Sequence, residues 1–334
     1  MINTNLKKIV NVYQVQYDGF KAPGFGDFLR GCFSMSQFIR VVNQASGASG
    51  ASGASGTFIE FDMDICNHPM AAYVMTKVKP SIAYNIIREF KINPTPVKDT
   101  ETEETMLQEI IQRFNALPVD EKGTYYGFCC KYEVYPVIEE SDKEFIRSRL
   151  LPTVSMGAYI LSVLKELNLK PNEYSVLHVR CSDEDSFPFG KQARPLTDTY
   201  FKTLDGLVDG VIDTQGETKK KYLVLSSHNG VKEHYKSRFV SRQSRICHLG
   251  LDDKQEADAT RDTMLDFFLM SMAKDIIGIT PYGVCGFSQE CAKLYNIPHK
   301  YVNFPLLDTE RKNFTMAHMP PAQRMAYDLL FRRQ

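Results

Sequence analysis

The sequence predicts an α/β protein whose second half is a doubly wound parallel sheet. Short apolar runs alternate with helical patterns from residue 174 onward, as they do where helices connect parallel strands. Near the start, over residues 9–42, a strand, a glycine-rich stretch and a helix follow one another. The length of 334 residues suggests two domains, which we place at 1–150 and 151–318, followed by a terminal helix over 319–334.

The first half carries the pattern of a strand–helix–strand unit. Apolar residues alternate in residues 9–16 and 57–63 and recur at helical spacing in residues 32–42. An alanine-serine-glycine tract over residues 45–56 joins this helix to the second strand; it is natural or engineered and enters no functional argument. The other elements expected here are a loop and helix over 64–78, a periodic segment over 82–92, an acidic loop over 97–104, a helix over 105–117 and a strand region over 123–134.

The second half begins after a helical pattern that runs over residues 141–167. Glu144 follows Ser141 at the spacing of a capping box, and the pattern breaks near Pro152, where we place the domain boundary. Strands and helices then alternate. The expected strands are 174–177, 222–226, 245–249, 276–279 and 301–304, and the expected helices are 198–211, 231–239, 261–273 and 284–295.

Composition excludes several classes of function. Forty basic residues balance 40 acidic ones, so no global field favours nucleic acid or an anionic membrane. No apolar run has membrane-spanning length, and the start has no secretory cleavage pattern. The eight cysteines are scattered without zinc-ligand spacing, which predicts free buried thiols in a reducing compartment. We therefore expect a cytoplasmic protein without a membrane span, a nucleic-acid partner, a metal or a cofactor.

Polar clusters follow three strands of the predicted sheet, and the carboxyl ends of parallel strands share one edge. Taken alone, each cluster is equally compatible with a structural role, as a surface ion pair, a turn or a helix cap. Together they favour a nucleotide site, because an arginine suits a pyrophosphate and a helix amino end holds an anion. The clusters are His178, Arg180 and Asp183; Ser226, Ser227 and His228; and the stretch 280–288, with Gly286, Phe287 and Ser288 at the start of a helix.

The glycine-rich stretch of the first half has two interpretations that stay open. Gly24 and Gly26 would let backbone N–H groups approach a phosphate or sugar closely. The alternative is a tight turn in which Asp27 caps the following helix. The stretch is neither a dinucleotide fingerprint nor a P-loop, because a third glycine is misplaced and the lysine is missing.

Several motifs resemble those of the GT-B fucosyltransferases, the superfamily of α1,2-, α1,6- and protein O-fucosyltransferases. Gly24-Phe-Gly-Asp-Phe-Leu-Arg-Gly31 resembles the family's first-turn motif, and His178-Val-Arg-Cys-Ser-Asp183 its His-x-Arg-x-x-Asp motif. Leu223-Val-Leu-Ser-Ser-His-Asn229 resembles a family strand and turn, and residues 266–278, continuing to Phe287-Ser288, the third motif. The likeness covers most of residues 174–295 but little of the first half. It implies two Rossmann-like domains that face each other across a cleft, with the acceptor on the first and the sugar nucleotide on the second.

The resemblance implies metal-independent transfer with inversion, most plausibly of fucose from GDP-fucose to a glycan hydroxyl. It gives Arg180 the donor pyrophosphate, places His178 beside the nucleotide, and assigns Asp266 and Ser288 to base or phosphate. In several relatives a second arginine stands where Cys181 stands here, and an aspartate often stands where Ser227-His228 stands. The animal and plant members usually carry a membrane anchor and disulfides, which this chain does not show. A bacterial or virus-encoded enzyme of the cytoplasm fits this difference, as does a trimmed form of a longer protein, and Met1 favours the former.

A base must take the proton of the acceptor hydroxyl, and we favour Asp27 because its stretch would face the donor across the cleft. Asp18 and Asp64 are fallback bases on the acceptor side, where Arg30 would orient the acceptor or pair with Asp27. Two alternatives remain: the same scaffold with another donor, such as a xylose, rhamnose or galactose nucleotide, and a non-catalytic nucleotide- or carbohydrate-binding protein. A dehydrogenase is disfavoured because no Gly-x-Gly-x-x-Gly follows a strand.

Overall fold

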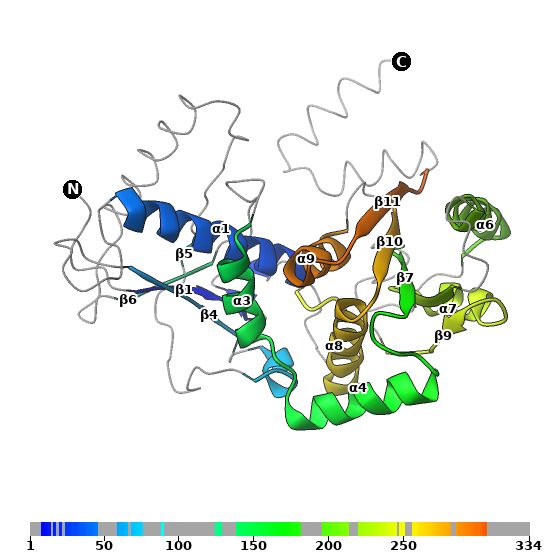
Figure 1. The fold of residues 1–334 in the computed structure, drawn as a ribbon, viewed down its shortest axis with the longest axis horizontal. Coiled ribbons are helices and arrows are strands. Elements are labelled where there is room, and N and C mark those ends of the chain that lie inside the picture. Colours follow the sequence, from blue (N-terminus) through cyan, green and yellow to red (C-terminus); the bar gives the residue numbers. More distant parts are fainter. Residues whose placement is uncertain are drawn as a thin grey trace, which may run out of the picture.

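The computed structural model of the protein describes residues 8–14, 16–17, 20–21, 24–45, 59–65, 68–75, 88–89, 124–128, 138–181, 196–213, 220–245, 247–250, 256–281 and 285–305. Two parallel sheets, one in each half of the chain, lie on either side of a group of helices (Figure 1). The predicted mixed α/β class is therefore confirmed. The helix expected over 105–117 and the terminal helix over 319–334 lie outside the described residues.

The sheet of the first half has the strand order β4-β1-β6-β5, and all its pairings are parallel. The helix α1 (Phe25–Ala45) leads from β1 to β4, which confirms the strand–helix–strand unit. His68, for which capping or packing is the expected role, caps the short helix η1 by accepting from Met70 N at 3.1 Å. The bounds are β1 Lys8–Val12, β4 Glu60–Asp64, β5 Arg88–Glu89 and β6 Thr124–Phe128, with η1 Pro69–Ala72 and the antiparallel pair β2 Gln16–Tyr17 and β3 Phe20–Lys21.

The sheet of the second half is all-parallel, with the order β11-β10-β7-β8-β9. Its bounds are β7 Tyr174–Val179, β8 Lys221–Ser226, β9 Val240–Ser241, β10 Asp275–Thr280 and β11 His299–Asn303. The chain starts in the middle at β7, moves outward through β8 and β9, and then crosses back to β10 and β11. This is the predicted doubly wound order, and its direction reverses between β7 and β10.

Helices cover both faces of this sheet because successive strand residues point to opposite sides. Leu177 of β7 belongs to a buried cluster with α6 (Asp198–Asp213) and α7 (Asn229–Tyr235). Its neighbour Val176 belongs to the cluster on the other face, with α8 (Ala257–Ser271) and α9 (Gly286–Tyr295). The expected break near Pro152 is confirmed, because α3 (Glu140–Arg149) ends before it and α4 (Val154–Glu166) begins after it.

Two elements of the second half differ from the sequence-based expectation. The strand expected over residues 245–249 is wrong: the described residues there are irregular, and the third strand is the shorter β9. Side chains of α8 take the place of a neighbouring strand, since Arg245 N donates to Asp262 Oδ2 at 3.1 Å and Cys247 N to Thr263 Oγ1 at 3.2 Å. The helix expected over 231–239 is α7, which begins earlier and ends at Tyr235.

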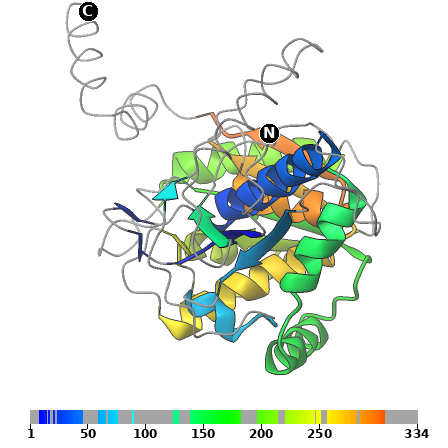
Figure 2. The same ribbon diagram turned by 90° about the vertical axis from the view of Figure 1, so that its left-hand side faces the viewer.

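The glycine-rich stretch predicted as a turn is instead the first two turns of α1, which begins at Phe25. Here the amino end of α1 meets the amino end of α9 from the other half, near the middle of Figure 1. In Figure 2 the blue helix α1 lies in front of the orange elements of the second half. A Cβ at Gly26 would lie 2.3 Å from the carbonyl carbon of Gly286, so only glycine allows this approach. The ring of Phe25 packs against Phe267 and Phe287, with centroids 5.2 and 6.5 Å away. One apolar cluster therefore spans both halves.

Replacing Gly26 with alanine should destabilise the protein, because the new methyl group collides with backbone that cannot rotate away. We expect a loss of about 1–3 kcal/mol in the free energy of unfolding, measured by urea denaturation. Gly210→Ala in α6 is the matched control, since a Cβ there meets nothing within 4 Å. It should gain about 0.5–1 kcal/mol, as alanine does in an exposed helix. Equal effects of the two substitutions would contradict the close contact.

Candidate functional site

The candidate site lies where the order of the second sheet reverses, at the carboxyl ends of β7 and β10. His178 of β7 pairs in register with Gly278 of β10, and Arg180 N, just beyond β7, donates to Ile279 O at 2.9 Å. His178 is 6% exposed, and its Nδ1 atom has no hydrogen-bond partner among the described residues. Its ring lies 6.1 Å from that of Phe287, at the start of α9. Open parallel sheets bind ligands at this point of reversal.

Two helix amino ends border the same place. The N-cap residue of α9, Cys285, makes no side-chain hydrogen bond to the first turn, and Ser288 Oγ donates backward to Cys285 O at 3.4 Å. The first turn of α1 lies against it through Gly26 and Gly286. Both ends carry partial positive charge on unpaired backbone N–H groups. Arg180, whose charge acts on His178, adds a cation at this edge of the sheet, and these features suit an anion such as a diphosphate.

Asp27 lies in the first turn of α1 and bears on both interpretations of the glycine-rich stretch, which are a close approach to a ligand and a capped turn. It is not the residue that precedes the helix, as a cap would be, because α1 begins at Phe25; it accepts a hydrogen bond from the backbone of Gly24, which precedes the helix, and its Oδ1 lies 3.0 Å from Arg30 Nη1. Its side chain is nevertheless 43% exposed. Loss of hydration raises the pKa of Asp27 above its ordinary value, against the opposing effect of Arg30. A carboxylate with a raised pKa and open access can accept a proton.

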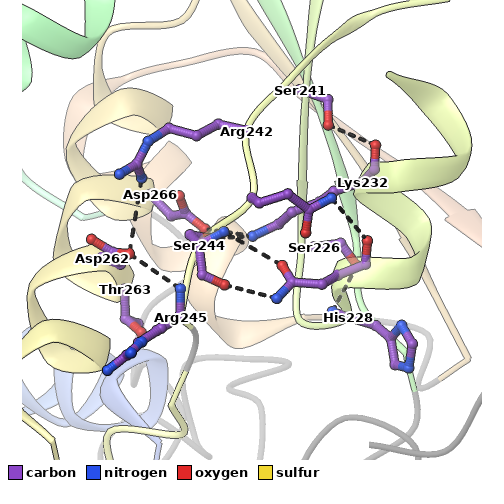
Figure 3. Close-up of polar contacts among 12 residues, drawn as sticks. Ser226, His228, Lys232, Ser241, Arg242, Ser244, Arg245, Asp262, Thr263 and Asp266 are labelled. Carbon is purple, nitrogen blue, oxygen red and sulfur yellow. Dashed lines mark hydrogen bonds and ion pairs between the residues drawn. The ribbon is translucent and has the colours of Figure 1, made fainter. Parts of the chain in front are cut away.

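A second, deeper set of charges lies behind His178. The side chain of Lys232 is buried, donates to Ser244 Oγ, and stands 3.9 Å from Asp266 Oδ2 (Figure 3). Burial raises the pKa of Asp266 and lowers that of Lys232, while each charge partly offsets the shift of the other. Burial, assisted by the charge of Arg180, lowers the pKa of His178 to about 4. The imidazole is therefore neutral at pH 7 and can donate or accept one hydrogen bond.

The segment after β9 forms a fixed wall beside these charges. Ser241 Oγ donates to Lys232 O at 2.7 Å, and Asn229 Nδ2 donates to Ser244 O at 3.0 Å (Figure 3). On its other side the same segment is bound to Asp262 of α8 through Arg245 N. An irregular segment held by side chains from two helices is rigid enough to shape a binding surface.

The polar residues after β8 lie at the same edge of the sheet, and their side chains bond to nearby backbone. Ser226 Oγ accepts from His228 N at 3.1 Å, and His228 Nδ1 caps α7 by accepting from Gly230 N at 2.9 Å. Ser227 Oγ accepts from Cys181 N at 3.2 Å and thereby ties the ends of β7 and β8 together. These bonds fix the loops that border the anion environment.

The structure thus brings several of the predicted site residues close to one another. Gly26 and Arg30 meet Gly286 and Phe287, and Asp27 pairs with Arg30 within α1. Phe287 lies near His178, on which the charges of Arg180 and Asp266 act, and Ser226, Ser227 and His228 follow the neighbouring strand β8. Gly24 precedes α1, and Ser288 lies in the first turn of α9. Asp64 is buried, 2% exposed, at the end of β4 in the first half, where its backbone oxygen accepts from Tyr13 N. Asp18 and Asp183 lie outside the described residues.

Three residues at the site carried no signal in the sequence. Lys232 and Glu290 look like ordinary charges on amphipathic helices, yet both are fully buried. His248 belongs to a stretch that the pattern assigned to a strand, and its Cε1 atom would lie 3.3 Å from a Cβ at Gly24. A charged residue inside an apolar helical stripe is the weak clue that was available for Lys232, which follows the buried Val231.

Two further observations concern only the part of the chain that the structure describes. It contains no group of three or more histidine, cysteine, aspartate or glutamate residues placed to hold a metal ion. None of its helices combines the length and apolar character that crossing a membrane requires. The predicted burial of the cysteines is confirmed for those described, which are Cys32, Cys181, Cys247, Cys285 and Cys291. Cys66, Cys129 and Cys130 lie outside the described residues.

Stability should decline in mild acid, because the pKa values of His68, His178 and His299 are each lowered to about 4. The unfolded chain binds protons below pH 6.5, whereas the folded protein resists them until about pH 4. The stabilisation that these lowered pKa values contribute is therefore fully present above pH 6.5. As the pH drops from 6.5 toward 4, the free energy of unfolding falls by about 1.4 kcal/mol per pH unit for each of these histidines. Urea denaturation from pH 7.5 to 4.5 measures the slope. His178→Asn should make it shallower, and an unchanged slope would show that His178 titrates normally.

Comparison with known proteins gives matches among solved structures alone. No family model and no curated protein matches the chain. NodZ α-1,6-fucosyltransferase soaked with GDP-fucose is 13% identical, over 90% of this chain and 95% of that one, with a TM-score of 0.47. NodZ from Bradyrhizobium is 12% identical over the same shares, also with a TM-score of 0.47. A variant of Arabidopsis thaliana FUT1 in complex with GDP is 9% identical, over 90% of this chain and 71% of that one, with a TM-score of 0.49. Since these TM-scores lie below 0.5, the functional assignment rests on the residues of this chain.

Proposed function

We propose that this protein is an inverting glycosyltransferase of GT-B arrangement. It moves a sugar, most plausibly fucose from GDP-fucose, onto a hydroxyl group of a glycan acceptor. The observation that carries the proposal is the meeting of His178 and Arg180, at the point where the strand order reverses, with the amino ends of two helices from different halves. The donor would bind on the second half and the acceptor on the first.

Donor binding follows from the charges at this edge. The diphosphate would accept hydrogen bonds from the first turn of α9 and an ion pair from Arg180, so that its negative charge is balanced without a metal ion. Neutral His178 would stand beside the nucleotide, and Asp266 would face base or phosphate. The motifs around Gly24, His178 and Asp266 that resemble those of fucosyltransferases favour GDP-fucose over other donors.

Transfer would proceed in one displacement. The acceptor oxygen forms a bond to the anomeric carbon of the sugar as the bond from that carbon to the diphosphate oxygen breaks, with inversion at the carbon. Asp27 takes the proton of the acceptor hydroxyl, a task suited to a partly exposed carboxylate with a raised pKa. The leaving nucleoside diphosphate keeps the electron pair of the broken bond, and Arg180 with the helix amino ends stabilises its charge.

One observation favours a second candidate, the same reaction with a different sugar nucleotide. Cys181 stands where several fucosyltransferases have a second arginine, and its side chain is buried and lies 3.2 Å from Tyr200 OH. This position therefore packs against α6 and supplies no second cation for a donor. A xylose, rhamnose or galactose nucleotide is the alternative donor, and a binding protein without catalysis is the alternative outside this class.

GDP should raise the melting temperature, and Arg180→Ala should abolish that rise. A ligand at 100 times its dissociation constant stabilises the folded protein by about 2.7 kcal/mol, which a thermal-shift assay detects. Arg238→Ala is the matched control, because this arginine lies on the surface and pairs with Asp209. It should keep the full shift. A shift with UDP alone would change the assigned donor, and no shift with GDP, UDP or their sugar conjugates would refute the site.

Asp27→Asn should leave GDP affinity unchanged within about 2-fold and lower the rate of transfer or donor hydrolysis by about 100-fold or more, the usual contribution of a general base. Asparagine keeps the shape of the side chain and a carbonyl oxygen that can accept from Arg30, but it cannot hold the transferred proton. Release of GDP from GDP-fucose measures the rate. Turnover close to that of the wild type would remove Asp27 from the proposed role.

A further inference from the structure

Glu290 of α9 is a buried carboxylate to which the proposed reaction gives no role. Its side chain is 0% exposed, although it belongs to the helix whose amino end borders the anion environment. Its Oε1 atom lies 3.2 Å from both Nε and Nη2 of Arg30, and its Oε2 atom lies 3.6 Å from Lys293 Nζ. Burying a carboxylate is costly unless such cations balance it, so the position of Glu290 depends on Arg30.

Arg30 links two carboxylates that come from different halves of the chain. Its Nη1 atom holds Asp27 at 3.0 Å on its own helix, while Nε and Nη2 hold Glu290 on α9. The guanidinium is planar, so fixing one side of the fork fixes the direction of the other. The Arg30 side chain is only 15% exposed, and its Nη2 would lie 3.2 Å from a Cβ at Gly286. Asp27 is therefore aimed by contacts that begin in the second half.

We propose that Glu290 is a positioning residue for the transfer reaction: its buried carboxylate orients Arg30 and, through Arg30, holds Asp27 at the place where the acceptor proton is taken. This inference rests on the proposed function, in which Asp27 is the base. It adds that the half expected to bind the nucleotide also controls the base of the half expected to bind the acceptor. Correct placement of Asp27 would then require the contact between α1 and α9.

The charges around Asp27 predict a change in its pKa on removal of Glu290, which a purely structural role of Glu290 would not produce. Arg30 faces it from α1, Glu290 and Lys293 lie on α9, Tyr301 of β11 faces Arg30 and Glu290, and His248 lies against Gly24. The negative charge of Glu290 competes with Asp27 for the positive charge of Arg30, and it also repels the carboxylate of Asp27. Its removal should therefore lower the pKa of Asp27 and weaken it as a base.

The test is Glu290→Gln, in which the amide oxygen still accepts from Arg30 but the charge is gone. GDP release from GDP-fucose in water is measured from pH 4.5 to 8, and GDP affinity is measured by calorimetry. We expect the rate at pH 7 to fall by about 10-fold, the acid limb of the pH profile to move to lower pH, and the Kd for GDP to stay within about 2-fold.

Asp142→Asn provides the matched control, because Asp142, like Glu290, is a carboxylate that holds an arginine of α1 from another helix. Asp142 of α3 is also a buried carboxylate, accepts from Ser36 Oγ at 2.5 Å, and holds Arg40 of α1 at 3.2 Å. It should lower stability without moving the pH profile. Arg30→Lys is a second variant, used should Glu290→Gln fail to fold, because one ammonium cannot hold both carboxylates as the fork does. It should lower the rate at unchanged GDP affinity.

Carboxyl ¹³C NMR separates this proposal from the proposed function. A lower pKa of Asp27 in Glu290→Gln, with the shifted pH profile, supports the positioning role. An unchanged pKa and profile in an active enzyme would overturn it while the proposed function stands. A wild-type protein that neither binds GDP nor releases it from GDP-fucose would overturn the proposed function and, with it, a positioning role in transfer.

Discussion

The contact between the backbones of Gly26 and Gly286 is the constraint on which the rest of the site depends. It lets the amino ends of α1 and α9 approach with no side chain between them. Because the helices meet there, Arg30 can reach Glu290, and the rings of Phe25, Phe267 and Phe287 can pack into one cluster. A larger residue at Gly26 would separate the ends and weaken the ion pairs and the ring packing together, whereas a Cβ at Gly286 would meet Arg30 Nη2 at 3.2 Å.

Some polar residues at this edge hold the local backbone in place, and others keep atoms that are available to a ligand. Ser226 and His228 hold backbone groups of their own loops. His178 keeps an unpaired buried Nδ1 among the described residues, and the Asp27 carboxylate keeps an exposed face. Buried polar atoms are rarely left unpaired, so an orphan nitrogen beside a helix amino end indicates a position that a ligand or water completes. This difference in hydrogen bonding explains why residues of similar type at one edge of the sheet can have different chemical roles.

Much of the second half could be predicted because β7, β8 and β10 are buried along almost their whole length and form apolar runs between helical patterns. The incorrect predictions have physical causes in tertiary contacts, which a local sequence pattern does not contain. Residues 245–249 look like a strand, but Asp262 and Thr263 supply the hydrogen bonds that a neighbouring strand would provide. The glycines around Gly26 look like a turn, whereas here glycine is required by a backbone 260 residues away. Lys232 and Glu290 become site residues only through tertiary burial, which spacing along a helix does not reveal.

The apolar cluster that spans both halves has a consequence for how the molecule unfolds. Phe25 and Phe28 from the first half share this cluster with Phe267 and Leu294 from the second. Separating the halves would expose these side chains to water, so each half is stabilised by its contact with the other. The described parts of the two sheets should then lose structure in one cooperative transition. A nucleotide bound at the edge of the second sheet, as proposed, would then protect amide hydrogens of the first sheet as well, and hydrogen exchange would report its presence far from the place where it binds.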